Sequence, residues 1–171
     1  RGYADAIASP QVLRAIAQGP RGRIAVTLFE WAGDHHAREI VGWTVIGGPQ
    51  DAQAVAATLL SEYSQSERRT SISGGIAHAV GLLEAVPFLP DRRVIDVSGD
   101  GPNNQGLPVT MARDAAVAKG ITINGLPLMT DGGYGSQFNI PDLDEYYRRC
   151  VIGGPGAFMI PVNDWDQFAE A

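Results

Sequence analysis

Apolar residues recur along the chain with two spacings, one typical of helices and one typical of buried strands. Over the first 17 residues the spacing is helical, and Ser9-Pro10 predicts that this helix is broken or capped there. Runs rich in β-branched residues predict strands over 23–31, 39–46, 93–99, 121–128 and 156–162. Further helices are predicted over 51–63, from 70 to the proline at 87, over 110–119, over 141–150 and after Asn163.

Because strands and helices alternate, the pattern predicts an α/β fold with a doubly wound, mostly parallel sheet. The connection between the first two strands is too short for a helical crossover. The second of them, 39–46, is therefore expected to run antiparallel at the sheet edge. A length of 171 residues favours a single domain over 1–171, with a core that needs no disulfide or metal.

Composition narrows the class of function. Apolar residues make up 44% of the chain and charged residues 19%, as in an ordinary globular protein. The net charge of −6 argues against nucleic acid as the main partner, because no basic surplus exists to neutralise phosphates. No apolar run reaches the length of a membrane span, so membrane insertion is not expected. The single cysteine, Cys150, excludes an internal disulfide and a cysteine-based zinc site.

Asp100 follows the strand predicted from Arg93 and lies between Gly99 and Gly101. In open α/β sheets, ligands bind outside the carboxyl ends of the strands, which is where Asp100 is expected. Thr70 begins the helix that leads into this strand, so its hydroxyl is expected at the same edge. A hydroxyl and a carboxylate are ligands that hard divalent cations accept. Two plainer interpretations stay open: Asp100 could cap a turn, and Thr70 could cap its helix.

The motif at 70–76 (TSISGGI), followed about thirty residues later by 97–101 (VSGDG), resembles von Willebrand factor A domains. A closer resemblance, to a family of uncharacterised bacterial A-domain-like proteins, spans essentially the whole chain. It is carried by the runs 93–104 (RVIDVSGDGPNN), 121–126 (ITINGL) and 146–158 (YYRRCVIGGPGAF). The resemblance implies a metal-ion-dependent adhesion site for Mg²⁺ or Mn²⁺, with Thr70 as the threonine ligand and Asp100 as the aspartate, which often acts through water.

One part of that family pattern is missing. The Asp-x-Ser-x-Ser loop should follow a first, central strand, and we expect this strand before Arg1, in a domain truncated at its N-terminus and also at its C-terminus. Residues 96–100 imitate the shape of that loop. Assigning the loop to them would leave too few residues for the parallel crossovers that follow. The chain is therefore expected to carry two of three metal loops and, alone, to bind a cation weakly or not at all.

The leading hypothesis is a non-enzymatic binding module whose cation accepts a carboxylate from a protein partner. The alternatives are a Mg²⁺-dependent hydrolase, in which Asp100 and Asp96 serve as metal or base groups and Asn103 orients the substrate, and a scaffold with a degenerate metal site. Periplasmic or secreted localisation follows from the resemblance alone.

Other side chains have simpler interpretations. His35 and His36 are expected in a solvated turn rather than as a metal pair, His78 at the surface, and Cys150 as a buried small hydrophobe. Asp96 is expected to lie deep and to bond backbone donors. Tyr134 and Phe138 could line a binding face or pack within their loop. Core positions are expected for Phe29, Trp31, Trp43 and Phe88.

Overall fold

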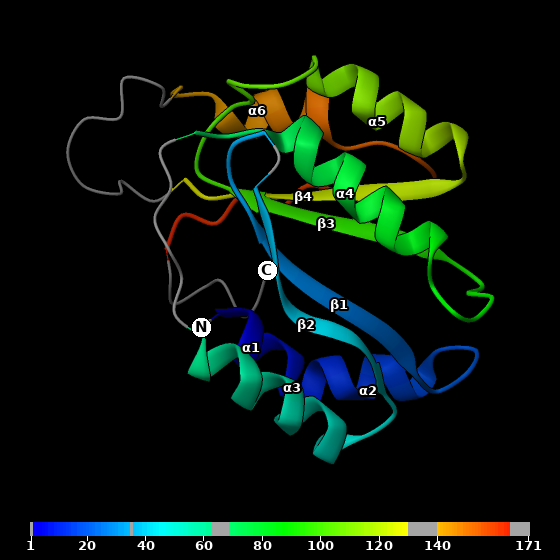
Figure 1. Ribbon diagram of the computed structural model, residues 1–171. Coiled ribbons are helices and arrows are strands. Elements are labelled where there is room, and N and C mark those ends of the chain that lie inside the picture. Colours follow the sequence, from blue (N-terminus) through cyan, green and yellow to red (C-terminus); the bar gives the residue numbers. More distant parts are fainter. Residues whose placement is uncertain (1, 35, 63–68, 130–139, 165–171) are drawn as a thin grey trace. The chain divides into compact units, whose positions relative to one another are not determined.

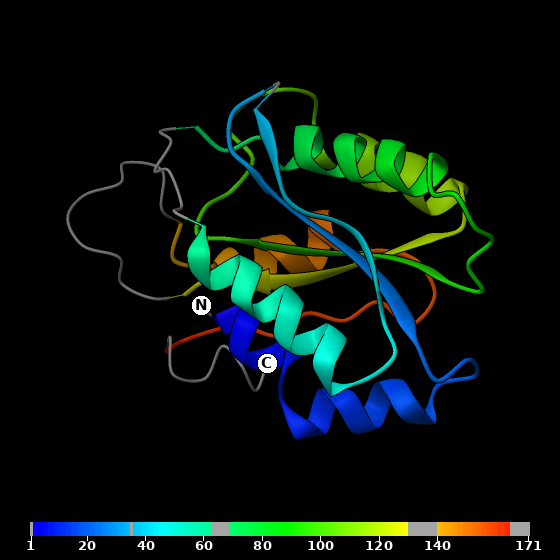
Figure 2. The same ribbon diagram turned by 60° about the horizontal axis from the view of Figure 1, so that its bottom comes forward.

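The computed structural model describes residues 2–34, 36–62, 69–129 and 140–164. Helices and strands alternate along these residues, as the sequence predicts (Figures 1 and 2). The elements are α1 Gly2–Ile7, α2 Pro10–Gln18, β1 Ile24–Trp31, β2 Ala37–Ile46, α3 Pro49–Ser61, α4 Ile72–Glu84, β3 Arg93–Gly99, α5 Val109–Ala118, β4 Ile121–Pro127, α6 Leu143–Tyr146 and the π-helix η1 Tyr147–Val151.

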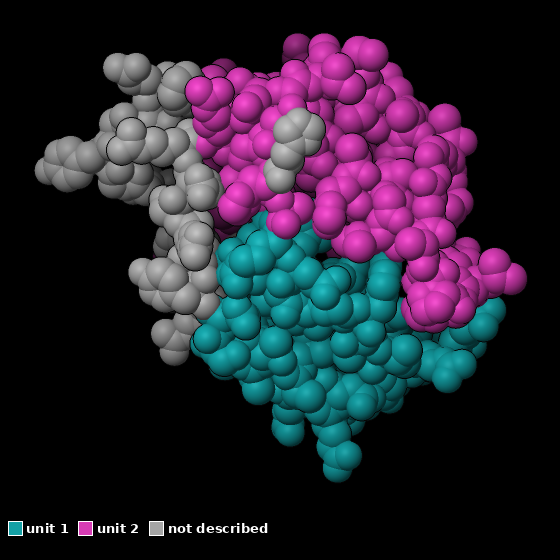
Figure 3. All heavy atoms as spheres, viewed as in Figure 1, with its two compact units in different colours: residues 1–30, 38–66, 165–170 teal, residues 31–37, 67–164, 171 magenta. Residues whose placement is uncertain are grey.

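The chain divides into two compact units, and each is built from discontinuous segments (Figure 3). The first contains residues 1–30, 38–66 and 165–170, and the second contains 31–37, 67–164 and 171. The turn of the β1–β2 hairpin thus belongs to the second unit, while most of its strands belong to the first.

The first unit packs its helices around part of the hairpin. The break predicted near Ser9 is confirmed: its side chain accepts a hydrogen bond from the Val12 N–H and caps α2, with Pro10 in the first turn. Strands β1 and β2 are neighbours in one sheet and are joined by a turn closed by the Ala32 N–H, which donates to the His36 carbonyl. A connection this short makes them antiparallel, as expected, and the Thr27 hydroxyl donates to the Val41 carbonyl across the pair. The buried core of this unit contains Ile16, Val41, Ile46, Ala52 and Val55.

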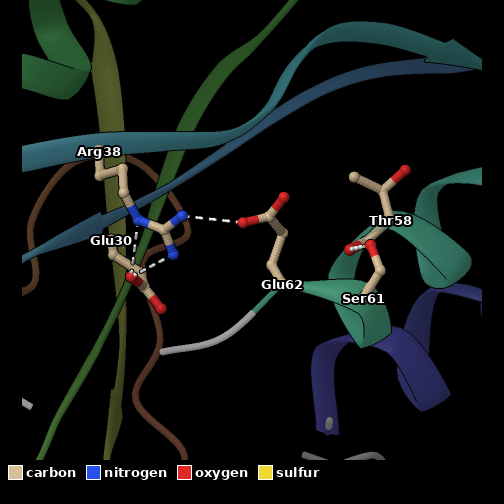
Figure 4. Close-up of polar contacts among 5 residues, drawn as sticks. All are labelled: Glu30, Arg38, Thr58, Ser61 and Glu62. Carbon is tan, nitrogen blue, oxygen red and sulfur yellow. Dashed lines mark hydrogen bonds and ion pairs between the residues drawn. The ribbon is translucent and has the colours of Figure 1, made fainter. Parts of the chain in front are cut away.

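An arginine links the hairpin to the end of α3 within the same unit (Figure 4). The Arg38 guanidinium donates to Glu30 from β1 and to Glu62, the residue after α3, with ion-pair distances of 2.9 and 2.8 Å. These hydrogen bonds raise the pKa of Arg38, Glu30 contributing most. All three side chains are partly exposed, so the cluster fixes side-chain geometry more than it stabilises the fold.

The second unit is built on a parallel strand pair. β3 and β4 run in register from Arg93 opposite Ile121 to Gly99 opposite Pro127, and β4 is buried along its whole length. The helix α4 packs against β3 and α5, and α5 packs against β4 and η1. Among the described residues the sheets are two-stranded, β1–β2 and β3–β4, and the second edge of β3 has no strand partner. The fold is thus α/β, partly parallel and partly antiparallel, as predicted.

Aromatic rings lie directly on glycine backbone in this unit. A Cβ added at Gly125 would lie 2.7 Å from Cδ1 of Tyr147, whose side chain is fully buried. A Cβ at Gly99 would lie 2.9 Å from the hydroxyl of the same tyrosine, and one at Gly75 would lie 3.1 Å from the Trp31 ring. A side chain larger than hydrogen at Gly99 or Gly125 would therefore force the Tyr147 ring to shift, and one at Gly75 would press on Trp31.

Two local predictions were wrong, and a third, the short helix, was confirmed with a different geometry. The strand expected over 156–162 forms only isolated parallel bridges, from Met159 to Gly125 and from Val162 to Leu128. Pro127 of β4, which has no N–H to donate, interrupts the pairing between them. The helix expected over 141–150 is a short α-helical turn continued by a π-helix. Phe88 is 41% exposed rather than part of the core.

The glycine-rich loop over 132–139, with Tyr134 and Phe138, and the helix expected after Asn163 fall outside the described residues. No helix in the described segments has both the length and the apolar character to cross a membrane.

Candidate functional site

Asp100 lies at the end of β3, where the sequence places it. The strand ends at Gly99, and the side chain of Asp100 is exposed. Within the described residues it forms no hydrogen bond or ion pair. Gly101, the next residue, is buried. The carboxylate is thus presented from a loop whose backbone is packed on the rest of the unit.

Thr70 is not the cap of its helix. The N-cap of α4 is Ser71, whose Oγ accepts a hydrogen bond of 3.1 Å from the Gly74 N–H. The Thr70 hydroxyl instead lies 3.8 Å from the position that a Cβ of Gly101 would take. The structure therefore brings the Thr70 hydroxyl beside the residue that follows Asp100. That either oxygen binds a cation stays a prediction.

Two asparagines hold these loops together. The Asn104 N–H donates to the Thr70 carbonyl and the Thr70 N–H donates to Asn104 Oδ1, both at 2.9 Å. Asn103 Oδ1 accepts from the Ser73 N–H at 3.0 Å, and Asn103 Nδ2 donates to the Leu107 carbonyl at 3.0 Å. We call Asn103 and Asn104 the asparagine clasp. The clasp fixes the backbone of Thr70 against the loop that carries Asp100.

The clasp has a further contact, with the last residue of α6. The backbone N–H of Asn103 donates to the phenolic oxygen of Tyr146, at 3.2 Å. Burial raises the pKa of Tyr146 because it disfavours the phenolate, and the Asn103 N–H partly opposes this by lowering it. A neutral phenol therefore accepts the bond at ordinary pH.

The hairpin turn between β1 and β2 borders the same loops. The Ser71 N–H donates to the Ala32 carbonyl at 2.6 Å, and the Asp34 N–H donates to Gln105 Oε1 at 2.9 Å. Gly106, with φ +83°, lies against this turn: a Cβ there would be 2.8 Å from Ser71 Oγ and 3.4 Å from Asp34 Oδ1. Three chain segments thus meet at this edge of the second unit, around 32–34, 70–74 and 100–107.

The donor set fits a hard cation in chemistry but is small. A hydroxyl and a carboxylate are both oxygen ligands, and Mg²⁺ is commonly bound through one or two carboxylates with water in the remaining positions. In the parts of the chain that the structure describes, no three His, Cys, Asp or Glu side chains gather as a metal site. Thr70 and Asp100 would therefore hold a cation only with water or with ligands from elsewhere.

The remaining candidates have other roles. Asp96 is exposed rather than deep, and its carboxylate accepts from the side-chain amide of Asn124 at 2.8 Å, not from backbone donors. Both amide groups of Asn103 hold the loop, so they do not face a substrate as the hydrolase hypothesis requires. His36 and His78 are exposed, as expected, while His35 is outside the described residues. Cys150 is half-buried.

Comparison of the sequence with known protein families identifies a family for this chain. The family model described as "Protein of unknown function (DUF1194)" matches residues 1–171. The chain belongs to the DUF1194 family. No curated protein matches the sequence.

Solved structures similar to this DUF1194 chain have von Willebrand factor A-like folds. Proximal thread matrix protein 1 from the mussel byssus is 12% identical, with a TM-score of 0.60 over 99% of this chain and 40% of that one. BatB from Bacteroides thetaiotaomicron is 19% identical, with a TM-score of 0.57 over 99% and 89%. An aerotolerance-related membrane protein from Bacteroides fragilis is 19% identical, with a TM-score of 0.59 over 99% and 83%.

At these identities the likeness shows the fold alone, and it confirms the predicted von Willebrand factor A-like architecture. This chain spans less than half of the mussel protein's length. Another structure of the mussel protein, 11% identical with a TM-score of 0.60 over 99% and 40%, is described as having a zinc-occupied MIDAS motif, the metal-ion-dependent adhesion site.

Proposed function

We propose that this DUF1194 chain is a binding module that recognises a protein partner through a divalent cation held by Thr70 and Asp100. Mg²⁺ or Mn²⁺ would take the hydroxyl and the carboxylate, directly or through water, and an open position would accept a carboxylate from the partner. The zinc-occupied site of the mussel protein supports a metal site on this fold. A periplasmic or secreted location belongs to the same proposal.

The asparagine clasp is the observation that carries the proposal. Four hydrogen bonds of the clasp organise the two loops, two of them directly at Thr70. Within the described residues the Thr70 hydroxyl and the Asp100 carboxylate are left without a hydrogen-bond partner. Ordering loops in advance lowers the entropy that ligand binding must overcome. The arrangement suits ligand capture, because it fixes the backbone and leaves two hard oxygen donors available.

A complete site needs more oxygen ligands than these. The edge of β3 that has no strand partner among the described residues lies beside the Asp100 loop in sequence and in space. A further parallel strand on this edge would deliver its own carboxyl-terminal loop next to Asp100, as the family resemblance implies. The test of the proposal uses the natural protein.

The test is isothermal titration calorimetry with MgCl₂ and MnCl₂. Asp100→Asn keeps the size of the side chain and removes its charge, so we expect cation binding to fall at least tenfold. Asp114→Asn is the matched control, because it removes an exposed carboxylate from α5, and it should bind like wild type. Equal binding by wild type and Asp100→Asn contradicts the proposal.

The enzymatic alternative is separated by a second assay. Ester and phosphate-ester substrates are incubated with the protein and Mg²⁺, and turnover that disappears in Asp100→Asn would replace the binding module with a hydrolase. Absence of both turnover and cation binding in the wild-type protein would leave a scaffold with a degenerate site.

A further inference from the structure

We infer that Tyr146 is a positioning residue of the proposed cation site: its phenolic oxygen holds the backbone of Asn103 and thereby sets the Asp100 loop against Thr70. The inference rests on the proposed function. It gives a role in the cation site to a residue of α6, which is far along the sequence from both loops. The phenolic oxygen of Tyr146 bonds Asn103, which lies between the two proposed ligands in the network of loop contacts. It acts on them through the asparagine clasp.

Asn103 is the residue of the clasp through which Tyr146 would act on the two loops. Its side-chain amide bonds the Ser73 N–H and the Leu107 carbonyl, and its backbone N–H is bonded by Tyr146. One residue is thus fixed in three directions. Without the phenolic oxygen, Asn103 loses one of its three restraints, and the loop from Asp100 would sample more conformations.

Tyr146 itself is held firmly enough to act as a fixed acceptor. It is the last residue of α6, and η1 begins with Tyr147, whose ring is fully buried against Gly125. The two tyrosine rings pack edge to face, with centroids 6.4 Å apart and an interplanar angle of 68°. The π-helical turn is closed by the Ile152 N–H, which bonds the Tyr147 carbonyl at 3.0 Å. π-Helical turns of this kind occur frequently at functional sites.

The loop that Tyr146 restrains needs an external restraint. Asp100 lies between two glycines, whose backbones lose more conformational entropy on ordering than those of other residues would. Any disorder of this segment must be removed when a cation binds, and a single hydrogen bond that removes it in advance changes affinity by about threefold to tenfold. That range is the expected contribution of the Tyr146 hydroxyl.

The experiment replaces Tyr146 with phenylalanine in the natural protein and measures three quantities. These are Mg²⁺ and Mn²⁺ affinity by calorimetry, the exchange rate of the Asn103 amide proton by NMR without metal, and the unfolding midpoint in EDTA. The control is Tyr3→Phe, which removes the phenolic oxygen of a half-buried tyrosine in the first unit.

We expect Tyr146→Phe to lower cation affinity about threefold to tenfold and to speed exchange of the Asn103 amide about tenfold, with an unfolding midpoint close to that of the control. Unchanged affinity in a protein whose wild type binds the cation overturns the inference and leaves the proposed function standing. If the wild type binds neither cation, the proposed function fails, and the exchange rate alone then decides whether Tyr146 restrains the loop.

A double-mutant cycle separates positioning from general stabilisation. If Tyr146 acts through Asn103, then adding Tyr146→Phe to Asn103→Ala should lower affinity by less than a further twofold. Effects that multiply independently would show that Tyr146 does not act through the clasp, and would overturn the inference.

Discussion

Replacing Asn103 with alanine tests the clasp directly. The substitution removes the acceptor of the Ser73 N–H and the donor to the Leu107 carbonyl. Ser73 is only 4% exposed, so its amide would lose a partner where water has little access, which costs about 1–3 kcal/mol. Leu107 is 63% exposed, and water can replace its lost bond. The expected loss is therefore about 2 kcal/mol of unfolding free energy.

The assay is urea unfolding followed by tryptophan fluorescence, which Trp31 reports from within the second unit because its ring lies on Gly75. For a chain of this size, about 2 kcal/mol corresponds to roughly 4–8 °C in thermal midpoint. Asn103→Asp is the matched control. It keeps the oxygen that accepts from Ser73 and places a negative charge at the N-terminus of α4, but its second oxygen cannot donate to the exposed Leu107 carbonyl. We therefore expect it to lose less stability than the alanine variant. An alanine variant as stable as wild type would refute the reasoning, and so would an aspartate variant as unstable as the alanine one.

Three further predictions concern glycines and a tyrosine of the second unit. Gly106→Ala should lower the free energy of unfolding by about 1–3 kcal/mol in chemical denaturation, because φ is +83° and the new Cβ meets buried hydroxyls. Gly81→Ala, in open space on α4, should raise the free energy of unfolding by about 0.5–1 kcal/mol. A Gly106→Ala variant more stable than Gly81→Ala would contradict this reasoning. Gly125→Ala should cost about 1–3 kcal/mol by pushing on Tyr147, and an unchanged thermal midpoint would show that the ring can move. Burial raises the pKa of Tyr146 above the ordinary value of 10.0, so its neutral form contributes stability below pH 10 that is lost as the pH rises through the folded-state pKa. In denaturation measured over a series of pH values, Tyr146→Phe should therefore lose less stability at alkaline pH than wild type. Equal losses in the two proteins would argue against this.

The parts of the fold that local patterns determine could be predicted from the sequence. Ser9 and Pro10 form a helix cap that residue propensities alone predict. The apolar run before Asp100 likewise indicates a strand without any distant contact. The alternation of strands and helices then gives the α/β class, and the resemblance placed it among von Willebrand factor A-like domains.

The parts that depend on distant contacts could not be predicted. The sequence predicts only a turn at Asn103 and Asn104, because asparagine favours turns whether or not another loop packs against it. Asn104 bonds Thr70 across 34 residues and Asn103 bonds Ser73 across 30, and these contacts become visible only when the loops are placed together. The π-helical turn after Tyr146 likewise depends on packing against β4, which the charge pattern of this segment does not encode.

Because Gly125 and Tyr147 are in contact, the sizes of the residues at these two positions should change together among related proteins. A larger residue at 125 is admissible only if the ring at 147 shrinks, so relatives with alanine at 125 should carry leucine or a smaller residue at 147. By the same reasoning, Tyr147→Leu should rescue Gly125→Ala, although neither substitution alone would be tolerated without loss.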